Sequence, residues 1–168
     1  MMIRISKPIN FIISSSLRTT SIRPRSEAAK FVFRQLSTNV GFDEEQAKIY
    51  AAISESHKHE KGPWPLITEK VGSFIDNCDR PKILDLATGP GQPALTLAQT
   101  YPNAHVNATD LSDDFISKVK AQVGTLGLTN VEPSVVDLQD LDKFSDNQFD
   151  IVTCCYGYMF AEDKVKAL

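Results

Sequence analysis

The stretch KILDLATGPGQPA, residues 82–94, passes from a short apolar run into a glycine-rich turn. Its first five residues are typical of a buried strand, and a helix is expected from Pro93, because the first helical turn tolerates proline. Gly89 and Gly91 let the backbone approach a ligand closely, and the following helix would direct its free N–H groups at that ligand. The stretch therefore predicts a strand–turn–helix unit that is suggestive of a nucleotide site.

Strands and helices alternate along the rest of the chain. Further strands are expected over 105–109, 131–136 and 149–155, and helices over 93–100 and 113–123. Strands that are apolar at nearly every position are typical of a parallel sheet covered by helices. The alternation predicts an α/β fold of the Rossmann-like, doubly wound type with a mostly parallel sheet.

Two helices are also expected upstream of this unit, over 43–56 and 66–77. The linker between them carries His57, His59 and Glu60, which have the chemistry of metal ligands. In a linker such residues are usually solvated, so we expect no metal site. The alternative is that they line the mouth of a substrate pocket.

Three acids occupy the ends of successive predicted strands: Asp85, Asp110 and Asp137. In a parallel sheet these ends meet at one edge, where ligands bind. Asp110 is placed to accept both hydroxyls of a ribose, Asp137 to accept from an adenine amine, and Asp85 to face an ammonium group. A ligand with a ribose, an adenine and a cationic amino-acid tail suits all three acids, and S-adenosyl-L-methionine is such a ligand.

Four motifs in this order resemble those of class I S-adenosylmethionine-dependent methyltransferases. They are ILDLATGPG at 83–91, ATDLS at 108–112, VDLQDL at 136–141 and DNQFDIV at 146–152. The resemblance covers 66–168 and favours the type 11-like group that includes the quinone and sterol methyltransferases. It implies methyl transfer from the sulfonium to a carbon, oxygen or nitrogen nucleophile of a small molecule.

The resemblance also implies which positions hold S-adenosyl-L-methionine. The glycine turn would hold its methionine end, the acid after the second strand its ribose diol, and the acid after the third strand its adenine amine. Two leucines would flank the adenine ring, and two residues after the fourth strand would lie under the sulfur. The implied cofactor-binding residues are Asp85, Ala87, Gly89, Gly91, Asp110, Leu111, Asp137, Leu138, Cys155 and Tyr156. The pattern assigns no catalytic base and no metal.

The sequence departs from the family pattern in two ways. Ala87 replaces the first glycine of the usual Asp-x-Gly-x-Gly-x-Gly. The family's sheet has seven strands in the order 3-2-1-4-5-7-6, whereas this sequence ends at Leu168, soon after the fourth predicted strand. We therefore expect a partial domain in which 149–155 has an open edge, available to a partner chain or to self-association.

Two alternative functions follow from these observations. The chain could be a non-catalytic fragment, or a cofactor-binding subunit that needs a partner chain. It could also be an NAD-type domain, because Gly89, Gly91 and Ala94 satisfy the dinucleotide fingerprint. Two features argue against dinucleotide binding. Asp85 lies between the strand and the glycines, and the motif at Asp137 has no counterpart in dinucleotide-binding domains.

The composition is that of a globular protein, but charge is unevenly distributed. The chain has 168 residues, 42% hydrophobic, and a net charge of -3. Residues 1–36 carry seven basic residues and one acid, and their first 26 residues contain no acid and six serines. This composition predicts a mitochondrial transit peptide, with a disordered basic tail as the alternative. Residues 37–65 would then be a helix and linker before the domain at 66–168.

Residues 37–168 have a net charge of -9, so we expect no electrostatic attraction to nucleic acid or to an anionic membrane surface. No apolar run reaches the roughly 18 residues that a transmembrane helix needs. The adjacent Cys154 and Cys155 are expected to be small buried hydrophobes, not redox groups. Trp64 and the aromatic run 156–160 are expected in the core, with a share in the substrate pocket as the alternative.

Overall fold

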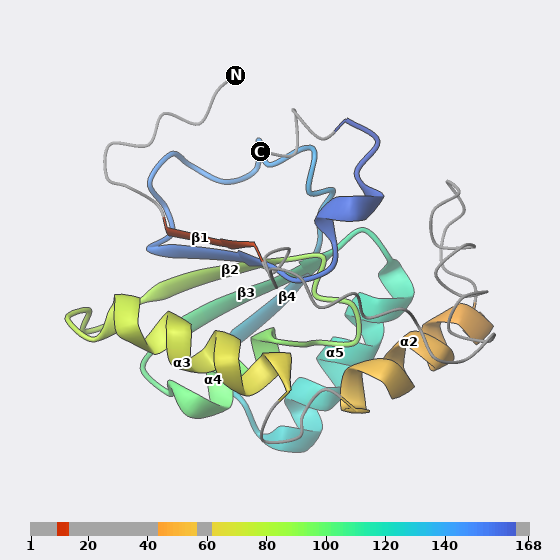
Figure 1. Ribbon diagram of the computed structural model, residues 1–168, viewed down its shortest axis with the longest axis horizontal. Helices are drawn as coiled ribbons and strands as arrows, with labels where there is room; N and C mark the ends of the chain where they lie inside the picture. Colours follow the sequence, from red (N-terminus) through yellow and green to blue (C-terminus); the bar gives the residue numbers. More distant parts are fainter. Residues whose placement is uncertain (1–9, 14–43, 57–61, 164–168) are drawn as a thin grey trace.

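The computed structural model describes residues 10–13, 44–56 and 62–163 (Figure 1). Its strands are β1 (Asn10–Ile13), β2 (Lys82–Leu86), β3 (His105–Asp110), β4 (Val131–Val135) and β5 (Ile151–Cys154). Its helices are α2 (Glu44–Ser56), α3 (Pro63–Ile75), α4 (Ala94–Thr100), α5 (Asp113–Leu126) and the short 3₁₀ helix η1 (Tyr158–Phe160).

The five strands form one sheet in the order β1-β5-β2-β3-β4, and every neighbouring pair is parallel. Among the four strands that the sequence predicted, the order β4-β3-β2-β5 reproduces the expected 3-2-1-4 arrangement. The α/β, Rossmann-like fold is therefore confirmed.

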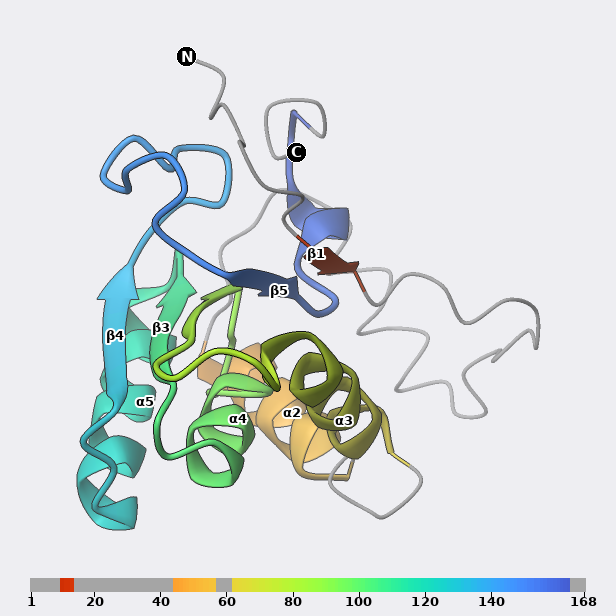
Figure 2. The same ribbon diagram turned by 90° about the vertical axis from the view of Figure 1, so that its left-hand side faces the viewer.

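Alternate residues of the central strands face two different apolar clusters. Ile83, Val106 and Ile151 belong to the larger cluster, which the helices cover. Leu84 and Val152 belong to a second cluster on the opposite face, where the chain after β4 and η1 supply the cover. Figure 2 shows the helices gathered on one side of the sheet and η1 on the other.

The expectation of an open edge on the fourth predicted strand is wrong. The backbone of β1 pairs with β5 in parallel register, from Asn10 opposite Ile151 to Ile13 opposite Cys154. The expectation followed from residues 37–168 alone, whereas a four-residue segment from the N-terminal region is enough to pair the short β5. The pairing of β1 does not test whether residues 1–36 are a transit peptide, which stays a prediction.

The boundaries of α3 also differ from the expectation of a helix over 66–77. The helix begins at Pro63, with Gly62 as its N-cap in an extended conformation. Two prolines in its first turn cost no hydrogen bond, because the first N–H groups of a helix have no intrahelical acceptor. Prolines that the sequence analysis assigned to a linker therefore start the helix.

The segment 57–61, with His57, His59 and Glu60, lies outside the described residues, so neither interpretation of it is tested. Across the described ranges, no helix has both the length and the apolar character needed to cross a bilayer.

Candidate functional site

Asp85 lies at the centre of the carboxyl edge of the sheet and is fully buried. Its Oδ1 accepts a hydrogen bond from Thr153 Oγ1 at 2.6 Å, across the β2–β5 pair. Its Oδ2 has no hydrogen-bond partner among the described residues. Burial raises the pKa of Asp85 to about 6, although the hydroxyls of Thr153 and Thr88 and the backbone N–H of Ala94 lie near enough to the carboxylate to oppose the shift. The site therefore contains a buried carboxylate oxygen that lacks the partner such groups normally have.

The glycine turn after β2 has left-handed backbone at three positions. The φ angles are 53° at Ala87, 56° at Gly89 and 105° at Gly91. Gln122 of α5 holds the turn from outside by donating from Nε2 to the Pro90 carbonyl oxygen at 2.9 Å. Two of these three positions have no side chain, so the backbone of the turn is open to close approach by a ligand.

Ala87, the departure from the family pattern, is matched by Gly157. A Cβ added at Gly157 would overlap the Cβ of Ala87 and come within 3.2 Å of Cys154 Sγ. The extra methyl group at 87 is therefore accommodated because the chain after β5 has no side chain at 157. This contact joins the glycine turn to the segment that follows β5.

Asp110, the last residue of β3, is bound to the glycine turn. Its Oδ2 accepts from the Gly89 backbone N–H at 2.8 Å, and its Oδ1 accepts from the Ser112 N–H at 2.9 Å. Burial raises the pKa of Asp110, while these backbone hydrogen bonds oppose the shift. Each carboxylate oxygen has further lone pairs, so the group can still accept hydrogen bonds from a ligand.

The residues predicted to surround an adenine ring lie at the same edge but differ in exposure. Leu111 is 66% exposed and therefore open to a ligand. Asp137 follows β4 and accepts the Gln139 backbone N–H at 2.8 Å. Leu138 packs against the second apolar cluster, so part of its surface is already covered.

Cys155 and Tyr156 follow β5 and complete the group on the helix-covered side. Cys155 is buried, and Tyr156 has a left-handed φ of 63°. The Tyr156 ring meets Trp64 edge to face, with ring centroids 6.0 Å apart. Trp64 is only 2% exposed and donates from Nε1 to the Ser54 carbonyl oxygen, which places it in the core as expected.

Both adjacent thiols are buried, in agreement with the prediction of small hydrophobes. Burial raises the pKa of Cys154 to about 11 and raises that of Cys155 as well. A thiol with a raised pKa is a poor source of the thiolate that redox chemistry and metal binding require. Among the described residues, no group of three or more His, Cys, Asp or Glu side chains could hold a metal ion.

Tyr50 of α2 is a site residue that the sequence analysis missed. A Cβ added at Gly89 would lie 3.0 Å from Tyr50 Cε1, so the ring lies against the glycine turn. Burial raises the pKa of Tyr50, and the nearby Cys155 and Asp110 raise it further. Tyr50 lies within the helix predicted over 43–56, and nothing in its local pattern indicates contact with a turn almost 40 residues away.

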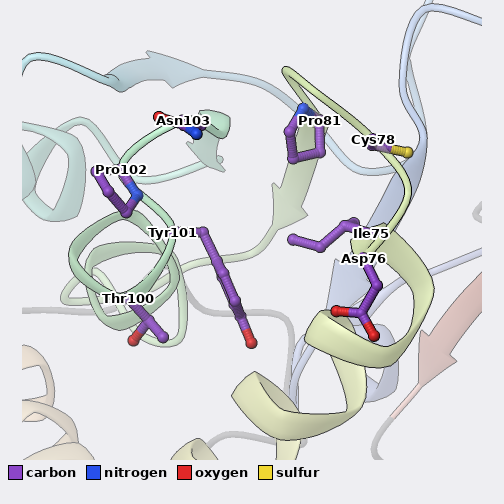
Figure 3. Close-up of a pocket in the computed structure, with 8 residues that line it drawn as sticks. All are labelled: Ile75, Asp76, Cys78, Pro81, Thr100, Tyr101, Pro102 and Asn103. Atoms are coloured by element: carbon purple, nitrogen blue, oxygen red, sulfur yellow. The ribbon is translucent and has the colours of Figure 1, made fainter.

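A pocket of about 190 Å³ opens at the opposite, amino edge of the sheet (Figure 3). It lies between the end of α3 and the end of α4, and its lining includes Asp76, Pro81 and Tyr101. None of the predicted site residues lines it. The acids, the left-handed turn and Tyr50 therefore form a separate site at the other end of the strands.

The comparisons with known proteins agree with this arrangement. The family model described as a methyltransferase domain matches residues 83–168. An uncharacterised protein of Mycobacterium tuberculosis is 31% identical over 114 residues, which are 68% of this chain and 38% of that protein. The demethylmenaquinone methyltransferase of Thermus thermophilus is 36% identical over 89 residues, 52% of this chain and 39% of the enzyme. The chain thus spans less than two fifths of the length of these relatives.

Two solved structures share the fold. A protein of Methanococcus maripaludis has a TM-score of 0.66 at 21% identity, covering 77% of this chain and 57% of its own. A SAM-dependent methyltransferase of Aquifex aeolicus has a TM-score of 0.55 at 21% identity, covering 76% and 64%.

Proposed function

The chain belongs to the methyltransferase domain family, and from this premise we propose that it binds S-adenosyl-L-methionine at the glycine turn and transfers the methyl group to a small molecule. The observation that carries the proposal is the unpartnered, fully buried Asp85 Oδ2. A buried carboxylate without a partner is costly, and a ligand cation or a water bridging to it would restore the missing interaction.

The residues around Asp85 fit the rest of such a ligand. Asp110 is a second carboxylate at the next strand end, with lone pairs left for ribose hydroxyls. Leu111 offers an exposed apolar surface beside it, suited to one face of an adenine ring. The glycine turn adds an approachable backbone next to both acids. These features favour a nucleoside with a cationic tail over a dinucleotide, whose pyrophosphate would lie close to Asp85.

The chemistry that these residues must supply is modest. The sulfonium of S-adenosyl-L-methionine is an activated methyl donor, so the chain mainly has to align two substrates and exclude water. Cys155, Tyr156 and Trp64 form a largely buried wall on the helix-covered side, which suits this role. A general base is required only when the acceptor must lose a proton, and we assign none.

We propose a small-molecule acceptor because of the relatives that carry quinone-related names. These are the Thermus thermophilus enzyme and a ubiquinone/menaquinone biosynthesis C-methyltransferase of Desulfotalea psychrophila, the latter 35% identical over 78 residues. Another relative, 36% identical over 73 residues, is a release factor glutamine methyltransferase of Flavobacterium psychrophilum, whose name indicates a protein acceptor. Turnover assays with quinone precursors and with a glutamine-containing peptide, each measuring S-adenosylhomocysteine release, separate the two classes.

Binding is tested by titration calorimetry of the full chain with S-adenosylhomocysteine. Asp110→Ala removes a charged acceptor and should weaken binding by about 1.5–3 kcal/mol. Glu132→Ala removes an exposed acid of β4 and is the matched control, which should leave the affinity unchanged. No heat of binding from the unaltered chain would refute the proposed cofactor, and equal affinity of Asp110→Ala would remove Asp110 from the site.

We also propose import into mitochondria, on the basis of the acid-free, serine-rich first 26 residues. Residues 1–36 fused to a fluorescent protein should direct it to mitochondria. Replacing Arg4, Arg18, Arg23 and Arg25 with Glu should abolish the effect. Diffuse fluorescence from the unaltered fusion would refute this part of the proposal.

A further inference from the structure

Helix α2 lies outside the segment that the family model matches, yet one of its side chains reaches the candidate site. The match covers 83–168, whereas α2 spans Glu44–Ser56. The ring of Tyr50 lies against Gly89, where an added Cβ would be 3.0 Å from Cε1 and 3.6 Å from Cδ1. The Tyr50 ring therefore covers the glycine turn from the helix-covered side of the sheet, where Figures 1 and 2 show α2.

The contacts that hold α2 in this position include an aromatic pair and a hydrogen bond. The Tyr50 ring packs on Phe115, in the first turn of α5, with centroids 6.2 Å apart and planes tilted by 57°. Trp64 of α3 donates from Nε1 to the Ser54 carbonyl oxygen at 2.9 Å, near the end of α2. Phe115 and Trp64 are both buried, so they anchor α2 to the body through rigid neighbours.

The surroundings of Tyr50 are acidic. Burial raises the pKa of its hydroxyl most, and the nearby Cys155, Asp110, Tyr156 and Asp85 raise that pKa further. Since burial and these groups raise its pKa, the phenol stays neutral and protonated at physiological pH. A neutral aromatic ring beside two acids is compatible with a cationic ligand, because it adds no opposing charge and offers a π face.

We propose that Tyr50 is a cofactor-contacting residue, whose ring covers the methionine end of S-adenosyl-L-methionine above Gly89. This inference rests on the proposed function, since it assumes that the glycine turn holds that end of the cofactor. It assigns to α2 a share of the binding site beyond the matched domain. The observations that place Tyr50 at the site concern its ring, which contacts Gly89 and Phe115.

A purely structural role for Tyr50 makes a different prediction. If the ring only packed α2 onto the body, its loss would loosen the whole site and weaken every ligand alike. If it covers the methionine end, its loss should affect only ligands that have this end. 5′-Methylthioadenosine keeps the adenosine and the sulfur but lacks the amino-acid tail, so it separates the two roles.

The experiment measures both ligands on the full chain, S-adenosylhomocysteine by calorimetry and 5′-methylthioadenosine by saturation-transfer NMR, which reports weak affinities. Tyr50→Leu should weaken S-adenosylhomocysteine about tenfold, equivalent to about 1.4 kcal/mol. It should change the affinity for 5′-methylthioadenosine by less than about twofold. Tyr50→Phe, which keeps the ring, should bind both ligands like the unaltered chain. Ile49→Ala, on the exposed side of α2, is the control for effects on the helix itself.

The outcomes distinguish failure of this inference from failure of the proposed function. If the unaltered chain binds neither ligand, the proposed cofactor is wrong. If it binds S-adenosylhomocysteine and Tyr50→Leu binds it equally well, Tyr50 is not a contact. Equal losses for both ligands would assign Tyr50 a structural role and overturn the inference.

Discussion

The amino ends and the carboxyl ends of the same parallel strands form two opposite edges of the sheet, here called the amino edge and the carboxyl edge. The two edges differ in how completely their polar groups are hydrogen-bonded. At the amino edge, Asn130 Nδ2 lies 3.0–3.3 Å from the carbonyl oxygens of three residues of the α4–β3 region. The Tyr101 hydroxyl donates to the Thr68 carbonyl oxygen at 2.7 Å. Asp150 Oδ2 accepts the Lys82 N–H at 2.9 Å where β2 begins. Side chains at this edge bind together chain segments that are distant in sequence.

The hydrogen bonding of polar side chains is less complete at the carboxyl edge. Asp85 Oδ2 is buried without a partner, and Ala87 and Tyr156 hold left-handed backbone although neither is glycine. Unsatisfied buried groups and strained backbone are rare in folded proteins and concentrate at functional sites. Under the proposed function, the amino edge contributes stability, whereas the carboxyl edge gives up stability for the proposed ligand binding.

The largest effect is expected from Gly157→Ala. The new Cβ would overlap that of Ala87, and neither atom can move away by rotating a side chain. Overpacking of this kind costs about 1–3 kcal/mol, and we expect the upper end because both positions are in turns joined to strands. Urea unfolding of the purified chain measures the loss.

Ala87→Gly should rescue Gly157→Ala, because it removes the other methyl group of the overlapping pair. The rescue should be incomplete, since the new Cβ also lies 3.2 Å from Cys154 Sγ. Equal stability of Gly157→Ala with and without Ala87→Gly would show that the two positions do not interact.

The next largest effect is expected from Asp85→Asn, and it depends on pH. The pKa of Asp85 rises from 3.8 to about 6 on folding, so the folded chain retains a proton that the unfolded chain loses between these values. The stability contributed by protonated Asp85 is therefore present below pH 4 and lost as the pH rises toward 6. Asn cannot ionise, so the variant should gain about 2–3 kcal/mol over the unaltered chain above pH 6 and match it near pH 4.

Thermal and urea unfolding at pH 4, 5, 6 and 7.5 measures this difference. The stabilised Asp85→Asn should also bind S-adenosylmethionine more weakly, which is the trade-off expected of a functional edge. A variant that is less stable than the unaltered chain at pH 7.5 would contradict the assignment of Asp85 as a destabilising group.

Features of the two edges that depend on local sequence patterns were predicted well. The strand 82–86 was predicted with its observed bounds, and the three acids were placed at one edge from the parallel order alone. Helix starts were less accurate, because Pro63 and Pro65 are read as helix breakers although the first turn tolerates them.

Contacts over long sequence distances were not predictable in the same way. The pairing of β1 with β5 joins segments about 140 residues apart, and nothing in Asn10–Ile13 specifies that partner. Tyr50 has the pattern of an ordinary helix face, and its place over Gly89 depends on how α2 docks. The hydrogen bond from Thr153 to Asp85 likewise follows from the register of β5 against β2, which single-chain patterns do not encode.

A smaller effect is expected from Asn130→Ala at the amino edge. The substitution removes a donor that lies near three carbonyl oxygens, so stability should fall by about 1–2 kcal/mol. The affinity for S-adenosylhomocysteine should not change, because the side chain lies at the other end of the strands. Urea unfolding and calorimetry on the same sample measure both quantities. A loss of affinity with unchanged stability would reverse the roles assigned to the two edges.

The smallest effect is expected from Gly127→Ala, and its value lies in the contrast with Gly89→Ala. The two glycines have nearly the same left-handed φ, 63° and 56°. Gly127 ends α5, and nothing lies within 4 Å of an added Cβ, so the substitution should cost only the backbone penalty of about 1 kcal/mol. Gly89→Ala incurs the same penalty and also brings a methyl group to 3.0 Å from the Tyr50 ring. If the carboxyl edge is the binding edge, the two variants should lose similar stability, with Gly89→Ala slightly lower, but only Gly89→Ala should lose affinity for S-adenosylhomocysteine. If both variants bind S-adenosylhomocysteine equally well, the left-handed turn at Gly89 is a structural cap like that at Gly127. The carboxyl edge would then not be the binding edge, and the proposed contrast between the two edges would be wrong.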